Sequence, residues 1–173
     1  MPVITDRIAT LADCAALSRL IDASIGELQK PFLSAGQIET SRVFMGLDTH
    51  LIADGTYFIV ECDGQMAGCG GWSRRATPYG ADHTPDRDDR LLDPESEAAR
   101  VRAMYTHPDF VRRGIGSRIL ALCETAARAE GFKAVQLTAT MAGLPLYRAC
   151  GFKDVQAMED RGVPLVLMHK SLI

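Results

Sequence analysis

The residues best suited to chemistry lie in the stretch "VRRGIGS", residues 111–117. A strand pattern ends before it and an apolar helical pattern follows it, so its backbone N–H groups should lie unpaired at a helix N-terminus, the positive end of the helix dipole. Gly114 and Gly116 let a ligand approach that backbone, and Arg112 and Arg113 add charged donors. This pattern predicts a phosphate-binding turn. Taken alone, it also fits glycines that only allow tight packing beside solvated arginines.

Two common nucleotide-binding motifs match this stretch poorly. A Walker loop requires Lys and then Ser or Thr after its last glycine, whereas Ser117 and Arg118 follow Gly116. A dinucleotide fingerprint requires a third glycine at position 119, which is Ile119. A nucleotide-binding domain therefore remains only as an alternative.

The stretch resembles the acyl-CoA loop of the GNAT superfamily of N-acetyltransferases, in which Arg or Gln is followed by two variable residues, Gly, one variable residue, and Gly or Ala. "VRRGIG" fills this pattern, except that Val111 stands at the Arg or Gln position. "MYTHPDF", residues 104–110, is similar to the family's strand end before the loop, and "TMAGLPLYRACGF", residues 140–152, to its later segment ending in Tyr, three residues and Gly-Phe. The resemblance covers residues 98–153.

The resemblance implies an α/β (α+β) fold with a mixed central sheet of six to seven strands and about four flanking helices. Two parallel strands, near Met104 and Leu137, would splay apart so that one pairs with the pantetheine arm of the co-substrate as with an added strand. Thr140 stands where relatives often carry Asn, so only part of that hydrogen bonding is kept. The implied acyl-CoA-binding residues are Met104, Tyr105, Thr106, Arg112, Arg113, Gly114, Ile115, Gly116, Ser117, Thr140 and Tyr147.

The resemblance also implies a reaction, the transfer of an acetyl group from acetyl-CoA, without a metal, to a primary amine by direct attack through a tetrahedral intermediate. The N–H of Met104 would donate to the thioester oxygen as charge develops there. Tyr147 aligns with the tyrosine that protonates the leaving thiolate in many relatives. Alternatively, Tyr147 only packs at the sheet edge, or the chain is a non-catalytic acyl-CoA sensor or partner-binding module. The acceptor, a small-molecule amine or a protein amine, is not identified by any motif.

A protonated amine must lose a proton before or during attack, and the sequence does not single out the base. Glu61, Glu97 and His83 are candidates by residue type, and each also fits a solvated surface position. Trp72 and Tyr105 fit either an acceptor pocket or ordinary core packing. His107, beside a proline, fits a turn.

The patterning predicts the elements that position these residues. A strand is expected over 3–9, then a helix capped by Asp13 and a second helix within 34–47. A hairpin should turn at residues 63–64, with a bulge or close backbone approach at the glycines near position 70. A strand at 99–106, a helix ending at Gly131, a strand at 133–139, a short helix at 143–150 and two final strands complete one sheet.

Residues 1–173 are expected to form a single acetyltransferase domain. The long loop 74–97 is either a substrate lid or a solvated insertion. With 47% hydrophobic residues the chain can build a sizeable core.

Composition argues against several classes of partner. A net charge of −3 gives no basic field for nucleic acid or anionic membranes, and no apolar run approaches a membrane span. The scattered cysteines and the absence of a signal-peptide pattern favour a cytoplasmic protein with reduced thiols. A homodimer is expected only because relatives often pair.

Overall fold

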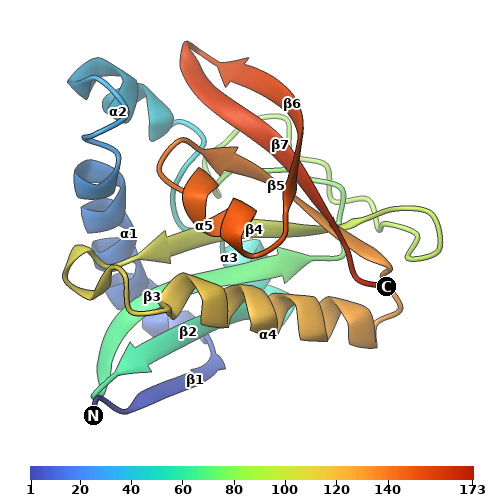
Figure 1. Cartoon of the computed structure of the whole chain (residues 1–173), viewed down its shortest axis with the longest axis horizontal. Coiled ribbons are helices and arrows are strands. Elements are labelled where there is room, and N and C mark those ends of the chain that lie inside the picture. The colour runs from blue at the N-terminus through green and yellow to red at the C-terminus, as the bar shows by residue number, and fades with distance from the viewer.

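The computed structural model describes residues 1–173, whose strands form one seven-stranded sheet in the order β1-β2-β3-β4-β5-β7-β6. All neighbouring strands are antiparallel except β4 and β5, which are parallel (Figure 1). The strands are β1 (Ile4–Ile8), β2 (Tyr57–Cys62), β3 (Gln65–Ser73), β4 (Ala99–Thr106), β5 (Ala134–Thr140), β6 (Lys153–Asp160) and β7 (Val163–Ser171). The expected mixed α/β (α+β) sheet is confirmed.

Helices connect and cover these strands. They are the 3₁₀ turns η1 (Leu11–Asp13) and η2 (Pro108–Phe110) and the helices α1 (Cys14–Leu28), α2 (Ala35–Ser41), α3 (Thr49–Ala53), α4 (Ile115–Ala129) and α5 (Leu144–Ala149). The short α3 was not expected, because five residues give too little periodicity to read. The helix expected within 34–47 ends at Ser41, and the chain then turns so that the N–H of Gly46 donates to the Tyr105 hydroxyl over 3.0 Å.

The N-terminal cap of α1 differs in detail from the expected one. Asp13 occupies the cap position, but its carboxylate makes no capping bond to α1. It accepts a hydrogen bond from the N–H of Thr10 over 2.8 Å and pairs with Arg7. The hydrogen bond with Arg7 lowers the pKa of Asp13 to about 2. Asp13 therefore ties β1 to the entry of α1 as a charged group.

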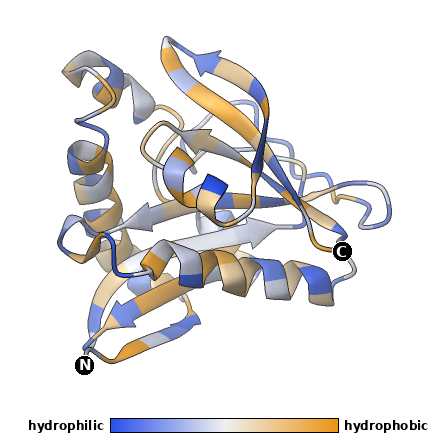
Figure 2. Ribbon diagram, viewed as in Figure 1, coloured by the Kyte–Doolittle hydropathy of each residue, from blue (hydrophilic) through white to orange (hydrophobic).

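The two faces of the sheet carry separate apolar cores. Figure 1 shows α4 lying across one face, where it packs mainly on β3 and β4, while α1 contacts the same strands in the second core. The stripe Ile115, Ile119, Leu120 and Cys123 of α4 is buried, as helical spacing requires. Figure 2 shows that many residues of β7 are hydrophobic where this strand pairs with β5.

The parallel strands β4 and β5 pair only at their beginnings. Ala99 lies opposite Val135 and Arg100 opposite Gln136, and beyond these residues the strands diverge (Figure 1). This splay leaves main-chain groups at the end of β4 without a neighbouring strand on one side. The splayed pair predicted near Met104 and Leu137 is thus confirmed.

A bulge interrupts β4 on its other side as well. In the pairing with β3, Tyr105 lies opposite Cys69, and the next paired residue, Arg102, lies opposite Gly71. Ala103 and Met104, which lie between them, have no partner in the ladder. Ala103 adopts a left-handed φ of 54°, which costs a non-glycine residue on the order of 1 kcal/mol. A Cβ at Gly70 would collide with the side chains of Met104 and Ile119. The bulge predicted at these glycines is confirmed by the shift in pairing between Cys69 and Gly71.

The loop 74–97 is tied to the body of the protein. Its two arms bond to each other, as between Ala76 N and Arg90 O over 2.9 Å and between Leu92 N and Arg74 O over 2.8 Å. At its far end the hydroxyl of Tyr79 donates to Asp160 over 2.8 Å. The loop is therefore an ordered strap, and its action as a lid stays a prediction.

Three further features of the structure concern membrane-spanning helices, disulfides and metal-binding groups. No helix combines the length and apolar character needed to cross a membrane. All five cysteines are free, and Cys62, Cys69 and Cys123 are buried. No group of three or more His, Cys, Asp or Glu side chains comes together to hold a metal ion.

Candidate active site

A cleft of about 700 Å³ opens where β4 and β5 diverge. Its walls come from the end of β4, the loop into α4, the segment leading into α5, and the C-terminal half of α1. Of the predicted acyl-CoA-binding residues, those lining it are Met104, Tyr105, Thr106, Arg112, Gly114, Ile115, Gly116, Ser117, Thr140 and Tyr147. The exception is Arg113, whose guanidinium lies 5.2 Å from the centre of the Phe110 ring, outside the lining.

The N-terminus of α4 presents free donors to this cleft. The first main-chain bond of the helix runs from Arg118 N to Gly114 O, so the N–H groups of residues 115–117 have no protein acceptor. Gly114 has a left-handed φ of 78°, and space for a Cβ is open there. Gly116 faces α5, where a Cβ would collide with Leu146. Both interpretations of these glycines therefore apply, each to one residue. Gly116 allows tight packing against α5, and Gly114 shapes the turn beside the free amides.

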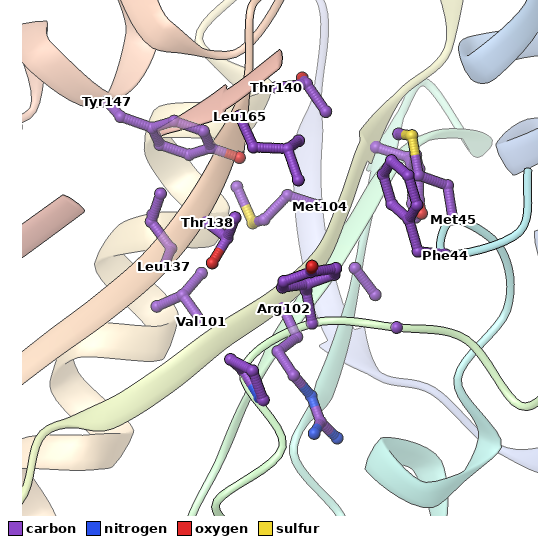
Figure 3. Close-up of a pocket in the computed structure, with 15 residues that line it drawn as sticks. Phe44, Met45, Val101, Arg102, Met104, Leu137, Thr138, Thr140, Tyr147 and Leu165 are labelled. Carbon is purple, nitrogen blue, oxygen red and sulfur yellow. The ribbon is translucent and has the colours of Figure 1, made fainter. Parts of the chain in front are cut away.

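Tyr147 stands in α5 with its ring buried between Gly143 and Phe152. Its hydroxyl makes no hydrogen bond within the protein, and Figure 3 shows it pointing toward the space between Thr138, Leu165 and Met104. Burial raises the pKa of Tyr147 well above that of free tyrosine, so the hydroxyl keeps its proton at neutral pH. The geometry offers a proton donor beside the bulge of β4.

A second cavity, of about 80 Å³, adjoins the cleft. The two share the residues Met45, Met104, Tyr105, Thr140 and Tyr147. Pro78, Tyr79 and Gly80 bring the strap 74–97 into its wall, and Phe44 packs edge-on against Tyr79 with ring centres 5.7 Å apart. Ten of the 15 residues that line the second cavity are hydrophobic, and the cavity meets the cleft at Tyr147 and Met104, which makes it the candidate acceptor pocket.

A buried ion cluster stands behind the second cavity. Arg102, which is 4% exposed and lines the cavity, places Nη2 3.0 Å from the Asp48 carboxylate. Asp48 is fully buried and also binds Arg87 over 3.2 Å. Burial lowers the pKa of Arg102. The two guanidinium groups of Arg87 and Arg102 thus share the Asp48 carboxylate, and the charges of Asp54 and Asp89 also act on Arg102.

None of the candidate bases lines either cavity. Glu61 pairs with Arg7 on the outer strands, Glu97 pairs with Arg90, and the ring of His83 bonds to the Arg42 carbonyl over 2.6 Å. Neither cavity has any Asp, Glu or His in its lining.

The aromatic residues divide between core and cavity. Trp72 is 1% exposed and packs against Phe132 in the core, whereas Tyr105 lines both cavities. His107 serves the turn, as expected: its Nδ1 accepts a hydrogen bond from the N–H of Asp109 over 3.0 Å.

One wall of the cleft was missed by sequence reasoning. It is formed by Ser24, Ile25, Leu28, Gln29, Phe32 and Met45. Ile25 belongs to the helical stripe that fits a core, and nothing in its spacing separates a core face from a cleft wall. Phe32 is half exposed at this wall, but that exposure is a property of the fold, so the sequence held no signal for the wall.

Comparison with known proteins agrees with this architecture. The family model described as acetyltransferase (GNAT) domain matches residues 53–154. Because that match spans more than half of the chain, the protein belongs to the GNAT family of acetyltransferases. A search of curated proteins gave no match.

Solved structures share the fold at low sequence identity. PaiA N-acetyltransferase from Thermoplasma acidophilum, solved with coenzyme A, superposes with a TM-score of 0.68 at 14% identity, covering 98% of this chain and 99% of that one. A GCN5-related N-acetyltransferase from Rhodopseudomonas palustris gives 0.69 at 20% identity, covering 99% and 96%. YncA from Salmonella typhimurium, solved with acetyl-CoA, gives 0.64 at 17% identity, covering 98% and 94%.

Proposed function

We propose that this protein transfers an acetyl group from acetyl-CoA to a primary amine, with the co-substrate in the cleft and the acceptor in the second cavity. The observation that carries the proposal is the placement of Tyr147 and Met104 where the two cavities meet. The residues fit the co-substrate. Free amides at residues 115–117 and the side chain of Arg112 suit its diphosphate, and the unpaired edge of β4 suits its pantetheine arm.

The proposed reaction follows from this arrangement. The amine nitrogen forms a bond to the thioester carbon, and the carbonyl electron pair moves to oxygen, where the N–H of Met104 stabilises it. The C–S bond then breaks as the oxygen reforms its double bond. Tyr147 gives its proton to the departing sulfur, and the proton lost by the attacking nitrogen replaces it through solvent. The products are an acetylated amine and the free thiol of coenzyme A.

The experiment is an assay of thiol release with acetyl-CoA and a panel of amines, on wild type and Tyr147→Phe. We expect release from wild type and a loss of 10²-fold to 10⁴-fold in kcat for the variant, the usual contribution of a general acid. Calorimetry should show equal affinity for coenzyme A, because the phenylalanine ring keeps the packing on Phe152.

The same assays separate the alternatives. Binding of acetyl-CoA without thiol release on any amine would favour the acyl-CoA sensor. Protection against heat by ATP or NAD but not by coenzyme A would favour a nucleotide-binding domain, since a ligand that prefers the native state stabilises it. A homodimer stays a prediction, which light scattering would check.

A further inference from the structure

The junction of the two cavities holds no side chain that can take a proton at neutral pH. Three tyrosines from separate elements line the second cavity: Tyr147 on α5, Tyr105 on β4 and Tyr79 on the strap. Burial raises the pKa of Tyr79 to about 12, and raises those of Tyr105 and Tyr147 further. The only charged side chains in the linings are those of Arg102 and Arg112, which are hydrogen-bond donors and cannot accept a proton.

Two carboxylates touch lining residues from behind, and both are occupied. Asp48 is held by the two guanidinium groups of Arg87 and Arg102. Asp160 accepts from the Tyr79 hydroxyl over 2.8 Å and pairs with Arg161 over 2.7 Å. Neither lies in a lining, so neither contacts an amine bound there.

We infer that the acceptor presents an α-amino group, as at the amino terminus of a peptide, rather than the more basic amine of a lysine side chain or a polyamine. This inference rests on the proposed acetyl transfer. Without a base in the site, the amine must arrive already neutral. The linings also hold no carboxylate that could bind a second cation on the acceptor.

Magnitudes support this choice. At pH 7 about one seventh of an α-amino group of pKa about 7.8 is neutral, against about one part in 2,500 of a lysine amine of pKa about 10.4. Greater basicity makes the neutral lysine amine the stronger nucleophile. For thiols, the gain in nucleophilicity with rising pKa offsets only about half of the loss in deprotonated fraction, on a logarithmic scale. A thiol whose pKa lies near the ambient pH therefore reacts fastest. Applied to amines, this trade-off leaves the α-amino group ahead by on the order of tenfold.

In this reaction the neutral nitrogen attacks, and its extra proton becomes acidic once the bond to carbon has formed. That proton passes to water, while Tyr147 supplies the proton that the sulfur takes up. Each turnover moves one proton from nitrogen to sulfur overall, so no base on the protein is consumed.

The test compares two peptides of equal length with the full-length protein and acetyl-CoA. One has a free amino terminus and no lysine, and the other has a blocked amino terminus and one lysine; spermidine serves as a polyamine probe. At pH 7 we expect kcat/KM for the first peptide to exceed that for the second by at least about tenfold. With rising pH, its kcat/KM should level off near the pKa of the α-amino group, about 8, whereas that for lysine should continue to rise.

Several outcomes would overturn the inference. Faster acetylation of lysine or spermidine would do so, as would one common inflection in kcat/KM below pH 8 for both peptides, because that inflection would belong to a base on the protein. Asp160→Asn should leave both pH profiles unchanged, and loss of activity with intact acetyl-CoA binding would identify Asp160 as a base acting through Tyr79. Absence of thiol release from every amine would overturn the acetyl transfer itself.

Discussion

The hydroxyl of Tyr57 donates a hydrogen bond to the carbonyl oxygen of Ala103 over 2.7 Å, joining the buried middle of the sheet to the bulge in β4. Tyr57 is fully buried, and its oxygen also lies 3.2 Å from the sulfur of Cys69. Because of the bulge, the Ala103 carbonyl has no partner on β3, and the Tyr57 hydroxyl provides one. It therefore holds the left-handed turn at Ala103 that sets the direction of the next amide, that of Met104.

Tyr57→Phe should loosen this turn while keeping the ring. We expect it to lower the free energy of unfolding by about 0.5–1.5 kcal/mol, because the partly buried Ala103 carbonyl loses its hydrogen bond. Affinity for acetyl-CoA should fall relative to affinity for coenzyme A, since only the thioester carries an oxygen for the Met104 amide. Paired calorimetric titrations measure that ratio.

Thr56→Val is the matched control for this prediction. It removes a neighbouring buried hydroxyl, bonded to the Leu51 carbonyl, without touching β4. It should leave the ratio of the two affinities at the wild-type value. An unchanged ratio in Tyr57→Phe as well would show that the bond does not position the amide.

Gly114→Ala should weaken binding of coenzyme A. Gly114 and Gly162 have similar left-handed φ angles, 78° and 85°, and at both no atom lies within 4 Å of an added Cβ. Each substitution to alanine should therefore cost about 1 kcal/mol of stability, the price of a left-handed alanine. Only Gly114 borders the cleft. Thermal unfolding should show equal losses for the two variants, while calorimetry should show weaker binding for Gly114→Ala alone; equal affinities would place the diphosphate elsewhere.

Asp48→Asn should destabilise the protein strongly. The substitution leaves the buried guanidinium groups of Arg87 and Arg102 without a counter-charge, which costs about 3–5 kcal/mol. Denaturant unfolding measures this loss. Asp22→Asn, which breaks the exposed pair with Arg42, should cost less than about 1 kcal/mol. Similar midpoints for the two variants would contradict the role assigned to the buried cluster.

We expect the stability of the protein to fall at alkaline pH because its tyrosines are buried. The chain has four, Tyr57, Tyr79, Tyr105 and Tyr147, and burial raises the pKa of each above 10. The folded state thus prefers the protonated form, and this preference stabilises it fully below pH 10 and is lost as the pH rises beyond that. Tyrosinate absorbance should appear near pH 10 in denaturant but only near pH 12 or on unfolding in the native protein. Titration of any tyrosine of the folded protein near pH 10 would contradict this burial.

Local patterns were sufficient for the order of elements and for the turn at Gly114 that begins α4. Alternation, helical stripes and the glycine positions are properties of neighbouring residues, which is why the hairpin at residues 63–64 and the ends of α4 and α5 were predictable. They failed at α3, which is too short to show a period, whereas α2 lies within the range 34–47 expected for it.

The sequence by itself determined the family resemblance, the sheet of mixed strands and the glycine-containing turn before α4, because contiguous motifs specify each of them. Only the tertiary structure decided that α1 and the strap 74–97 wall the two cavities, that Glu61, Glu97 and His83 lie outside both, and that Arg87 and Arg102 share Asp48. These relations join residues far apart in the chain. Their side chains meet only when packing of helices and loops on the sheet brings them together, and no local spacing records that.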